Sequence, residues 1–350
     1  RGSTGAAINM ITKKASTEYD FGSISLGAGT DEYGRATLDA NKKLNDEFAV
    51  RLNLLGGWRD VPDRDPADEE RLGALISGTY MPSERLRLDA DFYHLTANDL
   101  PDIGTYFVNG EPAEDTIVQA QENRDRLETE VNTGTFKIDY QLADNWRLQN
   151  GTRYGETENG YIVTSISQGG TATANLNVHQ GWQEISYFGN QLNLFHDRTL
   201  FNMDHTFMFG LEYVNEAVLN GVFDITTDAS ANNCIVAGRG GPAPDICVNQ
   251  ADYRGNSHWT GSVVKGDWDS DYDLETISAV FMDTVHLNDI FTLFAGVRYD
   301  YFDYSNNAFG RGAATPTLFS YDDGYWNYHA GLVMAANDDL NFYFNFSTST

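Results

Sequence analysis

Apolar and polar residues alternate along most of the chain, whereas sustained helical periodicity is almost absent. Segment 340–347, for example, reads Leu-Asn-Phe-Tyr-Phe-Asn-Phe-Ser, with Leu or Phe at every even position. Because successive side chains of a β-strand point to opposite faces, this period of two predicts strands with one apolar and one polar face. The same alternation occurs in segments 48–54, 86–93, 136–141, 207–213 and 291–300. The pattern therefore predicts an all-β chain with about thirteen strands.

The connections between the predicted strands alternate in length. Tight polar turns are expected at 43–47, 82–85, 143–145, 288–290 and 337–339, with a somewhat longer one at 197–204. Mostly longer loops are expected at 61–70, 99–128, 159–180, 220–270 and 306–324. Many strands reach the roughly 9–11 residues that a tilted strand needs to cross a bilayer. Short turns at one rim and long loops at the other are typical of an antiparallel outer-membrane barrel.

A soluble β-sandwich would show the same alternation, so the period alone leaves two interpretations open. In a sandwich, the apolar face would form a core and the polar face would meet water. In a membrane barrel, the apolar face would meet lipid, and charged residues such as Arg51, Asp89 and Arg298 would line a wet lumen. The loop asymmetry, the strand lengths and the aromatic residues near strand ends favour the barrel.

Composition and charge narrow the range of functions. The chain has 23 Lys and Arg against 51 Asp and Glu, a net charge of −28, which argues against binding to nucleic acid. Mean hydropathy is −0.44, and no apolar stretch is long enough for a membrane-spanning helix. The sequence contains no His-Glu-x-x-His, Gly-x-Ser-x-Gly or phosphate-binding glycine motif. We therefore predict no catalytic residues, no enzymatic activity and no resident cofactor.

The opening residues carry a family resemblance. Residues 1–14 read Arg-Gly-Ser-Thr-Gly-Ala-Ala-Ile-Asn-Met-Ile-Thr-Lys-Lys, which resembles the end of the plug domain of TonB-dependent outer-membrane receptors. Ala6 and Ala7 stand where that pattern usually has Gly-Val, and Ala15 stands where Pro often follows. Further along, Leu-Pro-Asp at 100–102 and Thr-Arg-Tyr-Gly at 152–155 are similar to receptors for ferric catecholate siderophores, and Ala-Gly-Val-Arg-Tyr-Asp at 295–300 fits the wider siderophore-receptor branch.

The resemblance implies a barrel of about 22 strands that is occluded by an N-terminal plug. In this chain, residues 1–17 would be the C-terminal end of the plug domain. Residues 18–350 would be the N-terminal part of a transmembrane β-barrel and hold about thirteen of the expected strands. The chain is thus expected to be a fragment that lacks most of the plug and the C-terminal barrel strands.

The same resemblance implies a function in transport. The expected protein is a TonB-dependent receptor in the outer membrane of a Gram-negative bacterium, active in the uptake of ferric siderophores of the catecholate type. Its implied partners are the TonB complex, bound through a segment upstream of Arg1, the ferric siderophore, and outer-membrane lipid and lipopolysaccharide. Two alternatives remain: a receptor for another nutrient, such as a cobalamin or a glycan, and a soluble β-rich carbohydrate-active protein.

A ferric catecholate complex is anionic and carries planar aromatic groups, so Arg and aromatic side chains are the natural ligands to seek. Each candidate has an equally plausible structural role, as a girdle aromatic or as part of an ion pair in the wall. The candidates in the predicted loops and the adjoining wall are Tyr106, Phe107, Arg124, Arg126, Arg153, Tyr161 and Trp182.

Two further features lie in or beside the longest predicted loop. Cys234 and Cys247 are expected to form a disulfide, because exported loops lie in an oxidising environment. Two free thiols are the alternative. The residues Asp267, Asp269, Asp271 and Asp273 alternate. In an extended segment their carboxylates would share one face, where a divalent cation would relieve their repulsion. A solvated acidic face is the competing interpretation.

Overall fold

The computed structural model describes residues 11–104, 107–108, 111–112, 120–168, 173–227, 246–249, 259–310, 312–337 and 339–348. Thirteen strands form the main path of one sheet: β1 (Phe21–Ala28), β2 (Gly34–Lys43), β3 (Phe48–Asp60), β4 (Asp68–Ser83), β5 (Leu86–Leu100), β8 (Arg126–Ala143), β9 (Trp146–Gln168), β10 (Thr173–Leu200), β11 (Met203–Thr227), β13 (Gly261–His286), β14 (Phe291–Ala308), β15 (Thr317–Asn337) and β16 (Leu340–Ser347). Short β12 (Ile246–Asn249) pairs with β10, whereas β6 (Phe107–Val108) and β7 (Glu111–Pro112) pair with each other. Within these residues, no helix is long and apolar enough to cross a membrane.

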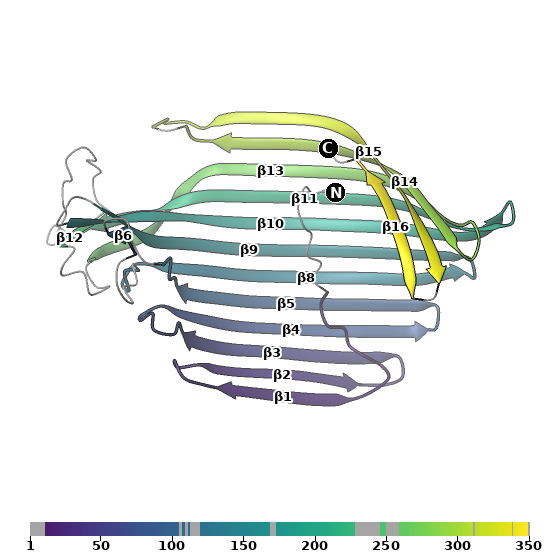
Figure 1. Cartoon of the computed structure of the whole chain (residues 1–350), viewed down its shortest axis with the longest axis horizontal. Helices are drawn as coiled ribbons and strands as arrows, with labels where there is room; N and C mark the ends of the chain where they lie inside the picture. The colour runs from purple at the N-terminus through teal and green to yellow at the C-terminus, as the bar shows by residue number, and fades with distance from the viewer. Residues whose placement is uncertain are drawn as a thin grey trace.

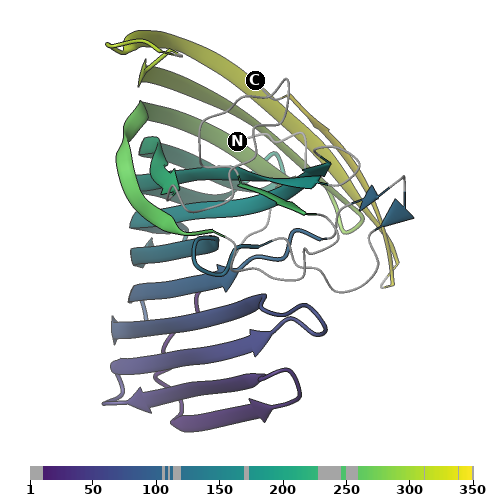
Figure 2. The same ribbon diagram turned by 90° about the vertical axis from the view of Figure 1, so that its left-hand side faces the viewer.

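Each strand of the main path pairs antiparallel with the next one along the chain. Figure 1 shows the strands from β1 to β13 side by side in chain order, while β14, β15 and β16 curve over at one side and β16 passes in front of other strands. Figure 2, turned by a quarter, shows that they form a curved wall with a concave side. This order confirms the predicted all-β, antiparallel architecture and the expected number of strands.

Several predicted loops are shorter than expected because the strands continue into them. The segment 159–180 was expected to be a loop, but β9 extends to Gln168 and β10 begins at Thr173, with Tyr161 paired to Gly181. In the same way, β11 extends to Thr227. The physical reason is that a hairpin satisfies its backbone hydrogen bonds internally, whatever solvent surrounds its faces.

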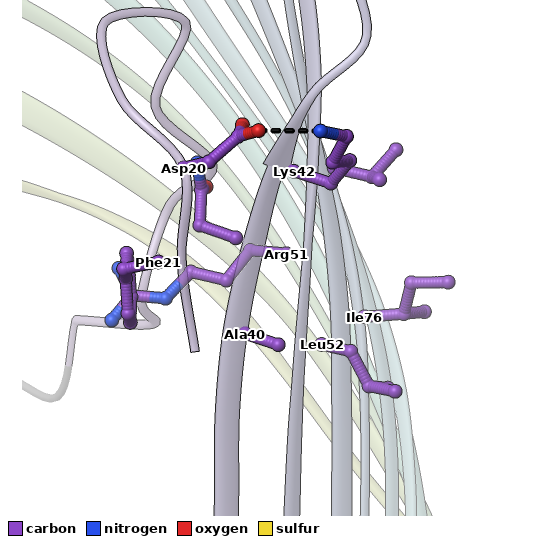
Figure 3. Close-up of a pocket in the computed structure, with 9 residues that line it drawn as sticks. Asp20, Phe21, Ala40, Lys42, Arg51, Leu52 and Ile76 are labelled. Carbon is purple, nitrogen blue, oxygen red and sulfur yellow. Dashed lines mark hydrogen bonds and ion pairs between the residues drawn. The ribbon is translucent and has the colours of Figure 1, made fainter. Parts of the chain in front are cut away.

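The two faces of the sheet differ in chemistry. The register joins Leu52, Ile76 and Phe92 across three strands, and these side chains are 38%, 55% and 50% exposed. Their neighbours Arg51 and Asp91 belong to the opposite face. Figure 3 shows Arg51 extending to one side of the ribbon while Leu52 and Ile76 point to the other. A row of exposed apolar side chains is expected where a sheet meets hydrocarbon.

The polar face is the concave one, and we call it the lumen face. Residues 11–16 lie against it, and Thr79 Oγ1 donates a hydrogen bond to the carbonyl oxygen of Ala15 at 2.9 Å. In Figure 1 the trace that precedes β1 crosses in front of β3, β4 and β5, on the concave side seen in Figure 2. The opposite, apolar face is called the outer face below.

Packed apolar clusters are small and lie toward the loop end of the strands. One consists of Ala67 and Ala120 with Val61 and Leu100 against them. The other is built on Ile162, Trp182 and Phe223. Among the described residues, the rest of the sheet gains little from an internal core, as expected for a wall with lipid on one side.

Candidate functional site

The lumen face carries charged side chains that pair across neighbouring strands. Arg51 on β3 forms a bidentate pair with Asp39 on β2, at 2.8 Å from Nε to Oδ1 and 2.7 Å from Nη2 to Oδ2. On the far side of the sheet, Arg298 lies 3.0 Å from Glu212 and 2.7 Å from Asp300. Asp300 is 3% exposed, so this carboxylate depends on Arg298 and on the hydroxyl of Ser278, which donates at 2.5 Å.

Two neighbouring strands differ from this arrangement. Lys137 on β8 and Arg147 and Arg153 on β9 lie on the lumen face by register. Within the described residues, none of the three forms an ion pair: Arg147 lies over the ring of Phe195 and Arg153 Nε donates to the hydroxyl of Thr135 at 3.2 Å. The wall at β8 and β9 therefore keeps positive charge that the acidic remainder of the lumen face does not neutralise.

At the loop end, the Leu-Pro-Asp-Ile-Gly motif has a structural role. Asp102 receives two hydrogen bonds from Arg64, 2.6 Å from Nε and 2.7 Å from Nη2, and a third from the backbone N–H of Gly104 at 2.9 Å. The Arg64 guanidinium holds the pKa of Asp102 below its ordinary value. Gly104 has φ +94, a conformation that favours glycine. This clamp ties the β3–β4 loop to the segment after β5. Sequence analysis missed Arg64, since nothing local marks it as the partner of Asp102.

Arg124, predicted to contact ligand, is buried instead. Its side chain is 0% exposed and pairs with Asp125 at 3.0 Å. It also donates to Thr164 Oγ1 at 2.6 Å and lies over the ring of Trp259. Arg124 therefore holds the segment before β8 against β9, and it is closed to any ligand in this structure.

Trp182 is a packing residue as well, 7% exposed in the cluster with Ile162 and Phe223. Its indole N–H donates to the carbonyl oxygen of Val222 at 3.1 Å. A Cβ on Gly221 would lie 2.3 Å from its ring, so the close approach of β10 and β11 here requires glycine.

The seven candidates do not converge on one site. Arg153 and Tyr161 lie on the lumen face of β9, whereas Arg126 and Trp182 lie on the outer face by register. Arg126 lies over the ring of Phe223 and 3.1 Å from a carboxylate oxygen of Glu128. It shares with Trp182 a hollow of about 480 Å³. Tyr106 falls outside the described residues. Phe107 lies in β6, where the structure describes only its backbone.

The four alternating Asp residues all lie in β13. The pairing of β11 with β13 shifts register between Asn220 and Phe223, beside this stretch, so simple alternation is interrupted there. Among the described residues, no group of three or more His, Cys, Asp or Glu side chains is arranged to hold a metal ion. Cys247 lies in β12 and Cys234 outside the described residues, so their disulfide stays a prediction.

Comparison with known proteins agrees with this architecture. A probable TonB-dependent receptor of Bordetella pertussis, BfrD, is 27% identical over 369 residues, covering 100% of this chain and 49% of its own length. The catecholate siderophore receptor Fiu of Escherichia coli K12 is 23% identical, covering 98% of this chain and 48% of its own length. The chain thus spans about half the length of the curated relatives it matches.

Solved structures show the same fold. The siderophore receptor PiuA from Acinetobacter baumannii superposes with a TM-score of 0.80 at 25% identity, over 96% of this chain and 50% of that one. The closed form of Fiu superposes with a TM-score of 0.84 at 21% identity, over 99% and 52%. The profile of the family described as TonB dependent receptor-like, beta-barrel matches residues 77–350. The chain therefore belongs to the TonB-dependent receptors, a family of receptors rather than enzymes in the outer membrane of Gram-negative bacteria.

Proposed function

We propose that this chain is part of a receptor for the active uptake of ferric siderophores, of the catecholate type, with energy from the TonB complex. The observation that carries the proposal is the likeness over nearly the whole chain to proteins named as siderophore receptors, PiuA at 26% and Fiu at 23% identity. The ferric siderophore is cargo, and its passage needs no covalent step. The polar, charged lumen face suits a hydrophilic ligand.

Growth under iron limitation tests this function. A strain without its own catecholate receptors would be complemented with the receptor and supplied with one defined ferric siderophore at a time. We expect growth on catecholates, dependence on TonB, and no growth on ferric citrate. Growth on cobalamin or a glycan as the sole source would instead favour uptake of another nutrient. Membership of the TonB-dependent receptor family argues against the alternative of a soluble carbohydrate-active protein.

We also propose that Arg153 and Tyr161 contact the ferric complex from the lumen face. Arg153 forms no ion pair with the residues that the structure describes, and Tyr161 is 41% exposed. A charge-assisted hydrogen bond to an anion is worth about 1.5–3 kcal/mol. Arg153→Gln is therefore expected to weaken binding of the ferric complex about 10- to 150-fold, and Arg153→Lys less. Unchanged affinity in Arg153→Gln would remove this residue from the proposed site.

The proposed partners in the membrane are lipid and lipopolysaccharide. The exposed apolar side chains of the outer face suit hydrocarbon. Closer to the loops, Glu130 and Glu158 face each other across β8 and β9 on the outer face, beside Glu184 of β10, which pairs with Lys265. Like charges directly opposite are destabilising. The divalent cations that bridge lipopolysaccharide phosphates would relieve this repulsion. A rise in melting temperature with Mg²⁺ is expected in membranes containing lipopolysaccharide and not in phospholipid alone.

Finally, we propose that residues 1–17 end a plug domain. The part of this segment that the structure describes runs along the lumen face, where a plug would have to lie. Ala15 is 2% exposed there. Limited proteolysis of the receptor, with cleavage expected upstream of this segment before any cleavage within it, tests the boundary.

A further inference from the structure

The segment that precedes β1 is attached to the wall through its own backbone. Wall side chains from β3 and β4 donate to successive carbonyl oxygens: Ser77 Oγ to Lys13 at 3.0 Å, Arg51 Nη1 to Lys14 at 3.0 Å, and Thr79 Oγ1 to Ala15 at 2.9 Å. The backbone N–H and C=O groups of the strands are already used in hydrogen bonds within the sheet. The side chains of the lumen face therefore hold the segment.

Asn41 on β2 fixes the next residue from both sides. Its amide oxygen accepts from the backbone N–H of Ser16 at 2.8 Å, and its amide nitrogen donates to the carbonyl oxygen of Ser16 at 2.9 Å. Asn41 is 3% exposed and Thr79 1% exposed. These contacts are therefore shielded from water, where a lost partner leaves a buried polar group unsatisfied.

Two ion pairs add to the attachment. Lys13 lies 2.8 Å from Asp39 and Lys14 lies 2.8 Å from Asp89. The lysine side chains are 56% and 41% exposed, whereas the carboxylates of Asp39 and Asp89 are 20% and 8% exposed. The half-buried ion pairs therefore act together with the buried bonds to the backbone of the segment.

The end of the segment is tied down as well. Figure 3 shows Asp20 paired with Lys42, at 2.5 Å, and the guanidinium of Arg51 reaching Phe21. The guanidinium carbon lies 5.0 Å from the centre of that ring. The attachment thus extends from residue 13 to the first residue of β1.

We infer that residues 13–16 are a fixed anchor, which stays bound to β2, β3 and β4 while the plug upstream is displaced during uptake. The inference rests on the proposed function, and it takes the energy from the TonB complex to act as a pull on that plug. The anchoring bonds follow one another along the chain and come from several strands. A pull from upstream meets these bonds before it reaches β1, so the anchor sets the point at which displacement of the plug ends.

Cysteine labelling in cells tests the anchor. Ala15→Cys places a thiol at a position that is 2% exposed, and its labelling by a small maleimide is read by mass spectrometry of the peptide, apart from Cys234 and Cys247. We expect the labelling rate to change less than about twofold between cells with and without TonB during uptake. A rise of about tenfold or more with TonB would overturn the inference.

A matched pair of variants tests the bonds themselves. Thr79→Val removes the hydroxyl whose single hydrogen is shared between the carbonyl oxygen of Ala15, at 2.9 Å, and Asp89 Oδ1, at 2.7 Å. Labelling at residue 15 is expected to rise about tenfold in this variant. Thr276→Val is the control, because Thr276 is equally buried in the lumen face and its hydroxyl has no hydrogen-bond partner. Heat-modifiable mobility on gels checks that both variants fold. Equal labelling in the two variants would show that Thr79 does not hold the segment.

Uptake measured in the same cells separates the two proposals. If the unaltered receptor takes up no ferric siderophore, the proposed function fails, while the comparison of Thr79→Val with Thr276→Val still decides whether the segment is held. If uptake proceeds and residue 15 becomes labelled only with TonB, the function stands and the anchor falls.

Discussion

Replacing Leu211 by Arg tests which face of the sheet meets lipid. Leu211 lies on the outer face of β11, opposite Leu192 of β10, and is 60% exposed. Its neighbour Glu212 lies on the lumen face, opposite Gln191. These adjacent rows allow the same substitution to be made on either side of the wall, with Gln191→Arg as the matched control.

The expected magnitude follows from the surroundings of each site. An Arg on the lipid face of a barrel costs about 2–4 kcal/mol near the middle of the bilayer. At about 1.36 kcal/mol per tenfold, Leu211→Arg should shift the folding equilibrium about 30- to 900-fold toward the unfolded state. Gln191→Arg puts its charge in the lumen beside Glu212, so its free energy of unfolding should change by less than about 0.5 kcal/mol.

Urea titration of the receptor in phospholipid bilayers, followed by heat-modifiable mobility, gives both free energies of unfolding. The bilayer is essential, because the penalty arises from transferring a charge into hydrocarbon. A loss of stability in Gln191→Arg equal to or greater than that in Leu211→Arg would refute the assignment of the two faces.

Two other substitutions test the loop end. Trp182→Ala should destabilise the β9–β10–β11 cluster by about 3–5 kcal/mol, as for other buried aromatic residues, and speed hydrogen exchange there. Trp58→Ala is the control, at a side chain that is 57% exposed, and should leave the stability and the hydrogen exchange of this cluster unchanged. Asp102→Asn should loosen the β3–β4 loop, as seen by faster hydrogen exchange corrected for intrinsic rates. Because Arg64 lowers the pKa of Asp102 in the folded state, the pair stabilises the loop fully above the ordinary pKa of 3.8. That stabilisation is lost as pH falls through the lowered pKa. Wild-type protection should therefore decline below about pH 4 and that of the variant should not. Identical pH profiles would contradict the role of the pair.

The strands were predictable because their signal is local. Where one face meets lipid and the other water, polarity changes at every residue, as between Leu211 and Glu212. Beyond the bilayer that contrast is lost, since both faces of a hairpin meet water or loops. This explains why 159–180 was predicted to be a loop, although β9 and β10 pair through most of it.

The candidate site was predictable only in residue type. Arg124 has the chemistry that an anion needs, but its partners include Thr164, which is 40 residues away. Trp182 is likewise buried by Phe223 from another strand. Such long-range contacts decide whether a side chain packs or remains available, and no local pattern encodes them.

The strongly acidic composition does not oppose the proposed anionic cargo, because charge is distributed unevenly over the lumen face. Arg51 and Arg298 are neutralised by carboxylates within 3.0 Å. Arg153, in contrast, donates to a neutral hydroxyl, and its strand neighbours on the lumen face at β8 and β9 likewise lack ion pairs among the described residues. Screening limits the reach of distant charges to about 8–10 Å in physiological salt. Among the lumen-facing side chains of β8 and β9, Lys137, Arg147 and Arg153 outnumber Asp139, so an anion against this part of the wall meets a net positive charge.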